Sequence, residues 1–84
     1  MSPKPPVVSG KILIKFLSDL GYEVERQRGS HVRLKKKTLA GHHSITIPAH
    51  YEIARGTLND ILNSVALNCQ ISKNTLIKNL AEYI

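Results

Sequence analysis

The sequence lacks most of the features that define secreted, membrane and disulfide-rich proteins. Its 84 residues contain a single cysteine, Cys69, and no tryptophan. One cysteine cannot form an internal disulfide, and the initial Met-Ser-Pro-Lys-Pro-Pro lacks the apolar run of a signal peptide. No apolar stretch approaches the roughly 18 residues that cross a bilayer. We therefore expect a cytoplasmic protein with no membrane among its partners.

The ligand patterns of metal sites are also missing. His42, His43 and His50 are close in the sequence, but adjacent residues of a strand point to opposite faces, and no CxxC, HExxH or carboxylate cluster accompanies them. We expect no metal site and interpret His42 and His43 as loop residues. Cys69 has no base nearby, so a packed or half-buried thiol is expected. The short chain leaves no room for a cofactor domain, and no small-molecule cofactor is predicted.

Acidic residues are few, and the basic ones cluster. Six Asp and Glu stand against twelve Lys and Arg, which gives a formal net charge of +6. Residues 26–37 hold half of the basic residues, no acidic residue and one histidine. Such clustering favours a polyanionic partner. Nucleic acid is the first choice, an acidic protein the second and an anionic membrane the third.

The first helix is predicted from apolar periodicity. Residues 11–20 place apolar side chains at three- and four-residue spacing, Ser9 is suited to cap the amino-terminal end, and Gly21 supplies a left-handed stop. The proline-rich residues 1–8 are predicted to form a flexible arm. Residues 9–84 are then a single domain.

Two more helices are predicted in the second half of the chain. Thr57 and Asp60 resemble a capping box at the start of an amphipathic helix, with Asp in place of the usual Glu. Ser72 is a candidate cap for a short last helix that reaches Leu80.

Alternating apolar and polar residues predict three strands between the helices, over residues 22–27, 31–35 and 44–47. Residues 36–43 are interpreted as a polar connection, and Pro48 ends the third strand. Matching apolar residues with apolar ones and opposite charges with each other predicts the register of the first two strands. A three-residue connection, Arg28-Gly29-Ser30, achieves this, with Glu23 opposite Lys35, Val24 opposite Leu34, Glu25 opposite Arg33 and Gln27 opposite His31.

The order of elements predicts an α+β fold, α-β-β-β-α with a short helical tail. Its three-stranded antiparallel sheet carries the helices on one face and leaves the other open to solvent. The predicted alternation places His31, Arg33 and Lys35 on the open face.

His31 is the candidate catalyst. RNA cleavage needs a base that deprotonates the 2′-hydroxyl and positive charge around the phosphate, and a histidine among cations supplies both without a metal. Gly29 and Ser30 form the turn that positions His31, and the candidate phosphate-binding residues follow the same hairpin: Arg28, Arg33, Lys35, Lys36 and Lys37. The simpler interpretation of the same residues is a surface histidine on a solvated basic hairpin. Tyr51 is a further candidate contact for a base.

Five short motifs in order resemble the HicA toxins of prokaryotic type II toxin–antitoxin systems. They are Ser-Gly-Lys at 9–11, Leu-Gly-Tyr at 20–22, Arg-Gln-Arg-Gly-Ser-His at 26–31, Ile-Thr-Ile-Pro-Ala-His at 45–50 and Gly-Thr-Leu-Asn-Asp-Ile-Leu at 56–62. The resemblance implies a fold like a double-stranded-RNA-binding domain and an endoribonuclease that cuts mRNA. It places the family's catalytic histidine at His31, and it implies a HicB-type antitoxin that covers the active surface.

A binding module is the alternative to an enzyme. A basic hairpin and a helix end are sufficient to hold RNA through phosphates and 2′-hydroxyls. Such a protein blocks translation or recruits a partner without cutting. A helix-turn-helix DNA-binding protein fits poorly, because three strands separate the main helices.

Overall fold

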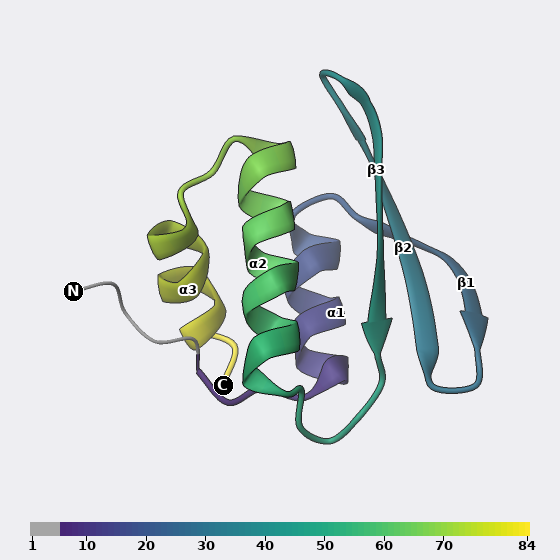
Figure 1. Cartoon of the computed structure of the whole chain (residues 1–84), viewed down its shortest axis with the longest axis vertical. Helices are drawn as coiled ribbons and strands as arrows, with labels where there is room; N and C mark the ends of the chain where they lie inside the picture. The colour runs from purple at the N-terminus through teal and green to yellow at the C-terminus, as the bar shows by residue number, and fades with distance from the viewer. Residues whose placement is uncertain (1–5) are drawn as a thin grey trace.

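The computed structural model describes residues 6–84 and confirms the predicted α+β order. The elements, labelled in Figure 1, are α1 (Gly10–Asp19), β1 (Glu23–Arg28), β2 (His31–Thr38), β3 (Gly41–Pro48), α2 (Arg55–Cys69) and α3 (Lys73–Ala81). Residues 1–5 of the predicted arm lie outside the described residues. Val8, in contrast, is 2% exposed, and its carbonyl accepts a hydrogen bond from the Ile53 N–H.

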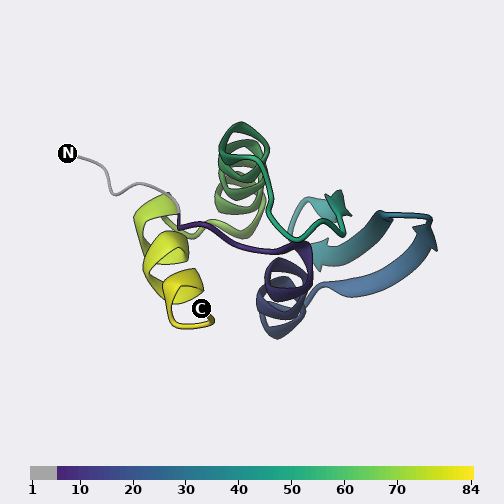
Figure 2. The same ribbon diagram turned by 90° about the horizontal axis from the view of Figure 1, so that it is seen from below.

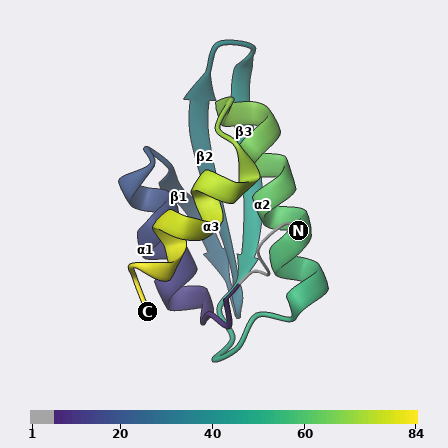
Figure 3. The same cartoon turned by 90° about the vertical axis from the view of Figure 1, so that its left-hand side faces the viewer.

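The strands form one antiparallel sheet in the order β1-β2-β3. α1 and α2 cover one face of this sheet, as predicted, and α3 packs on the side of these helices that faces away from the sheet (Figures 2 and 3). The other sheet face carries no element of the described chain. None of the described helices is long and apolar enough to cross a membrane.

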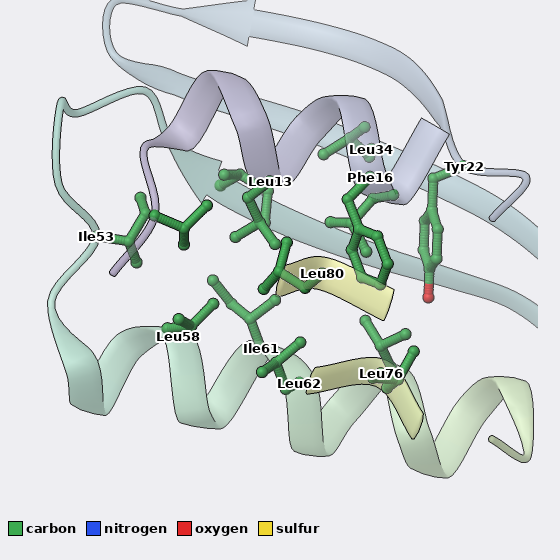
Figure 4. Close-up of a cluster of buried hydrophobic side chains, with 14 of the residues drawn as sticks. Leu13, Phe16, Tyr22, Leu34, Ile53, Leu58, Ile61, Leu62, Leu76 and Leu80 are labelled. Carbon is green, nitrogen blue, oxygen red and sulfur yellow. The ribbon is translucent and has the colours of Figure 1, made fainter. Parts of the chain in front are cut away.

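A single aliphatic core lies between the sheet and the helices (Figure 4). Leu13, Phe16 and Leu17 of α1 are almost completely buried, as the predicted periodicity requires. The side chain of Ser9 accepts a hydrogen bond from the Ile12 N–H, which confirms the predicted cap, and Gly21 has φ +105° just after the helix. Core residues of the other elements pack on the same cluster: Leu34 and Ile47 of the sheet, Leu58 and Leu62 of α2, and Leu76 and Leu80 of α3.

The second helix begins earlier than predicted. α2 starts at Arg55, its N-cap is Ala54, and no side chain caps it, so the proposed capping box at Thr57 and Asp60 is wrong. The Leu58 N–H donates a hydrogen bond to the Ala54 carbonyl at 2.9 Å, so the first helical turn already closes around Thr57. The predicted cap of the last helix is confirmed, since the Ser72 side chain accepts a hydrogen bond from the Thr75 N–H.

β2 and β3 extend through most of the segment predicted as a connection. The two strands pair continuously from His31 opposite Pro48 to Thr38 opposite Gly41, so His42 and His43 are strand residues and not loop residues. The long hairpin projects beyond the helices (Figures 1 and 3). Polar composition led to the wrong prediction, because an alternating strand with one open face tolerates polar residues along its length.

The register of β1 on β2 is correct at one end and wrong at the other. Glu23 lies opposite Lys35 and Val24 opposite Leu34, as predicted. The register then shifts, because Glu25 is an extra residue in β1, and Arg28 rather than Gln27 lies opposite His31. The predicted three-residue connection is therefore a two-residue turn combined with a β-bulge. Val24 is also 54% exposed, since edge strand β1 lies away from the helices.

Candidate functional site: the open face of the sheet

Strand alternation in β2 sorts the basic hairpin into two faces. Val32 and Leu34 are buried under the helices, whereas His31 and Arg33 are exposed on the open face, as predicted. Lys35 and Lys37 follow on the open face by the same alternation, and they line a shallow depression further along the sheet. They lie two and four residues beyond Arg33, away from the turn.

Lys36 points to the helix side of the sheet. Its Nζ donates a hydrogen bond to the Leu20 carbonyl at 2.6 Å and lies 5.8 Å from the centroid of the Tyr22 ring. The ammonium group thereby satisfies a carbonyl at the end of α1 and ties this helix to β2. The structure thus does not bring Lys36 together with His31.

The turn before His31 is fixed by its own backbone and by β3. Gly29 has φ +55°, a conformation that favours glycine, while Ser30 has no positive φ, which is the pattern of a type II′ turn. The Ser30 carbonyl accepts a hydrogen bond of 2.6 Å from the Ala49 N–H, immediately after β3. Ser30 and His31 are therefore held from both neighbouring strands.

The bulge at Glu25 determines which residues of β1 share a face with His31. Without the extra residue, the predicted register would place Glu25 and Gln27 on the open face. With it, Arg26 lies opposite Arg33 and Arg28 opposite His31. A hollow of about 110 Å³ is lined by these four residues together with Thr46.

Arg26 is a member of this group that the sequence alone does not indicate. Its charge was part of the basic cluster, but the predicted alternation placed it on the core side. A glycine within a strand often marks a bulge, but the residues beside Glu25 include no glycine. The strand pairing was needed to find it.

One carboxylate lies among these cations. Glu25 Oε2 is 3.3 Å from Arg33 Nε, and both side chains are about half exposed. A pair this exposed contributes about 0–1 kcal/mol to folding. The contact is made through Nε, and the guanidinium of Arg33 carries two further nitrogens that can donate to another acceptor.

A second group of polar side chains lies on the helix side of the sheet. The His43 ring is 9% exposed, its Nδ1 lies 2.6 Å from the Tyr22 hydroxyl, and its Nε2 lies 2.9 Å from Ser64 Oγ. The Tyr22 hydroxyl is also 3.5 Å from Cys69 Sγ. The thiol is free and half-buried, as predicted. This group joins Tyr22, just before β1, to β3 and α2 through the core, and no motif in the sequence indicates it.

Burial affects the titration of this internal group. Removal from water lowers the pKa of His43, because the charged imidazolium loses solvation. Burial also raises the pKa of Tyr22, and the hydrogen bond with Cys69 adds to that increase. A neutral imidazole accepts at one ring nitrogen and donates at the other, which matches its two hydroxyl neighbours. We interpret His43 as a structural residue.

The described residues contain no group of three or more His, Cys, Asp or Glu side chains arranged to hold a metal ion. His42 lies on the open face opposite Lys37, while His43 points into the core. The two adjacent histidines are therefore separated by the thickness of the strand.

The fold and the open face together define a small basic α+β domain that presents an exposed imidazole among guanidinium groups. The chain also matches the model of a family described as the HicA toxin of bacterial toxin-antitoxin, over residues 10–67. This match covers more than half of the chain. The protein therefore belongs to the HicA toxin family. It is a toxin of a toxin–antitoxin system, from a family whose members generally cleave mRNA and act with a cognate antitoxin. No curated protein and no solved structure matches the chain.

Proposed function

We propose that this protein is an endoribonuclease toxin that cuts mRNA in the cytoplasm with His31 as its acid–base group, without a metal ion. The observation that carries the proposal is the position of His31. It is exposed on the open sheet face, with Arg26, Arg28 and Arg33 lining the same hollow. An RNA strand reaches this face without passing any other element of the described chain.

In the proposed reaction His31 removes the proton of a ribose 2′-hydroxyl. The 2′ oxygen then attacks the adjacent phosphorus, the bond to the 5′ oxygen breaks, and a 2′,3′-cyclic phosphate and a 5′-hydroxyl form. The guanidinium groups of Arg26, Arg28 and Arg33 hold the phosphate and stabilise the additional negative charge of the transition state. The leaving 5′ oxygen takes its proton from another donor, because one imidazole cannot hold both protonation states at once.

The turn and the bulge have separate roles in this proposal. Gly29 and Ser30 fix the position of His31, and the bulge at Glu25 turns two arginines of β1 toward it. Lys35 and Lys37 are placed to contact phosphates further along the strand. Lys36 is not assigned to RNA, because its ammonium group binds the Leu20 carbonyl.

We also propose that the cognate antitoxin neutralises the protein by covering the open face. The arginines and His31 are exposed there, and a partner that supplies carboxylates would both pair with the guanidinium groups and exclude RNA. Addition of the purified antitoxin should protect labelled mRNA from cleavage. Protection by an antitoxin that leaves this face accessible to chemical modification of His31 would contradict the proposed docking.

The test of the nuclease uses His31→Ala with His42→Ala as a matched control. Both histidines are exposed on the same sheet face, but only His31 lies among the arginines. Labelled mRNA is incubated with each protein in EDTA and separated on a denaturing gel, and thermal unfolding by circular dichroism verifies that each variant is folded. We expect His31→Ala to lose about 100- to 10,000-fold in cleavage rate and His42→Ala to match the wild type.

Two results would contradict the proposal. If His31→Ala cuts at the wild-type rate in EDTA, His31 is not the catalyst. If the wild type leaves RNA intact but binds it with a steep salt dependence, the protein is the non-catalytic RNA-binding module instead.

A further inference from the structure

We propose that the cognate antitoxin binds this protein by adding a strand to the free edge of β3, so that an extended antitoxin segment becomes the fourth strand of the sheet. The segment carries carboxylates on the open face of the sheet and apolar side chains on the helix side. This inference rests on the proposed neutralisation by an antitoxin and adds the way in which the two proteins join.

The sheet has two edge strands, β1 and β3, and they differ in how they are protected. β1 contains the bulge at Glu25, and four of its six residues are charged: Glu23, Glu25, Arg26 and Arg28. Charges and bulges are the usual means by which an edge avoids pairing with another chain. β3 has no Lys, Arg, Asp or Glu, and its eight residues pair with β2 without a bulge. An unprotected edge of this length is a template for a further strand.

The backbone of β3 presents hydrogen-bonding groups along this edge. The Ala49 N–H binds the Ser30 carbonyl at 2.6 Å, and in an antiparallel ladder such hydrogen-bonded pairs alternate with pairs whose groups point outward. Counted back from Ala49 in the observed register, His42, Ser44 and Thr46 turn their N–H and C=O groups away from β2. Within the described part of the chain, no loop, cap or helix backbone binds these groups. They are available to an added strand.

The helix side of this edge is incompletely covered at Ile45. Its neighbours in the same row of β3, His43 and Ile47, are buried, and so is Leu34, its partner on β2. Ile45 itself is only partly buried. Neighbouring strands lie about 4.8 Å apart, so an apolar side chain on an added strand would pack beside Ile45 and complete its burial.

On the open face the added strand would meet neutral side chains first and cations behind them. Ser44 and His42 of β3 are exposed there, and they pair with Lys35 and Lys37 of β2. Side chains of the added strand would be two strand spacings, about 9.6 Å, from those lysines. A glutamate and a lysine that lean toward each other span this distance above the small Ser44 side chain. Carboxylates at these positions would therefore pair with the lysines.

The same charges argue against a second copy of this protein at the edge. Each copy has a formal net charge of +6. Pairing of β3 with β3 would bring together two open faces that carry Arg33, Lys35 and Lys37, and like charges across an interface disfavour binding. An acidic partner removes this repulsion. The position also explains neutralisation, because Thr46 lines the hollow that contains His31.

The first test measures amide hydrogen exchange by NMR in isotope-labelled protein, alone and with purified antitoxin. In the free protein the amides of His42, Ser44 and Thr46 should exchange fast, whereas those of Ile45 and Ile47, which bind β2, should exchange slowly. Antitoxin should slow the first three at least about 10-fold. Protection at every second residue of β3 is the signature of an added strand. A partner that only lies on the open face would not produce it.

The second test places proline at the centre of the edge. The Ser44 N–H does not bind β2, and an edge strand accepts proline where the N–H faces outward, so Ser44→Pro should fold. Ser44→Ala keeps the N–H and is the matched control, and thermal unfolding by circular dichroism verifies both. We expect Ser44→Pro to bind antitoxin at least about 10-fold more weakly than the wild type, and Ser44→Ala to bind equally well. If Ser44→Pro is unfolded, the exchange measurement decides alone.

The outcomes separate this inference from the proposed nuclease. Antitoxin that protects mRNA but leaves the three outward amides in fast exchange would overturn strand addition and leave the proposed nuclease intact. Equal binding by a folded Ser44→Pro would also overturn it. So would amides that become protected in the free protein as its concentration rises, because a second copy then occupies the edge. Alternating protection by antitoxin in a protein that cuts no RNA would refute the nuclease and support the added strand.

Discussion

Gly10 is the residue at which a minimal substitution should do most damage. It is the first residue of α1, and its α-carbon faces the backbone at the end of β3. A Cβ at this position would lie 2.3 Å from the Pro48 carbonyl oxygen and 2.8 Å from Ala49 Cα. The first of these is roughly 1 Å short of the 3.4 Å at which ordinary contact begins. Both neighbours are backbone atoms, which cannot rotate away as a side chain can.

The expected cost of Gly10→Ala has two parts. Overpacking typically costs about 1–3 kcal/mol. Moving α1 away from β3 also stretches the 2.8 Å hydrogen bond from the Gly10 N–H to the His50 carbonyl, and losing it costs about 0.5–1.5 kcal/mol. Together the free energy of unfolding should fall by about 1.5–4.5 kcal/mol. For a domain of this size the Tm should then fall by at least about 6 °C.

Gly56→Ala is the matched control. Gly56 is the second residue of α2, and an added Cβ there meets no atom within 4 Å. Alanine is the better helix former by up to about 1 kcal/mol, so this variant should be at least as stable as the wild type. Urea unfolding and thermal melts measure both variants. If Gly10→Ala is as stable as Gly56→Ala, the close approach of α1 to β3 is not as described.

Further predictions concern pH and salt. Because burial lowers the pKa of His43 below its unfolded value, its contribution to stability is complete above pH about 6.5 and is lost as the pH falls toward the lowered value. Urea unfolding at pH 7.5 and 5 should therefore show a larger acid loss for the wild type than for His43→Gln, and equal losses would contradict the linkage. In the His31→Ala background, removal of Arg26 or Arg28 should weaken binding of all single-stranded RNAs and reduce the salt slope by about 0.7 per lost phosphate contact. An unchanged slope would show that these arginines do not contact phosphate.

Much of the fold could be predicted because its signals are local. Ser9 and Ser72 cap helices through hydrogen bonds to residues three positions away, and apolar spacing within α1 identifies its buried face. The glycine of the β1–β2 turn has the positive φ that its sequence position suggested. Polarity was the misleading signal in β3, where His42 and His43 belong to a strand whose two faces differ.

The sequence by itself determined the order of helices and strands, the charge of the hairpin and the exposure of His31. These depend on propensity, alternation and turn chemistry within a few residues. Only the tertiary structure decided that Glu25 forms a bulge, and with it that Arg26 and Arg28 lie beside His31. It also decided that Lys36 binds the end of α1. The physical reason is that strand pairing and packing join residues far apart in the chain, and one extra residue reverses every side chain beyond it.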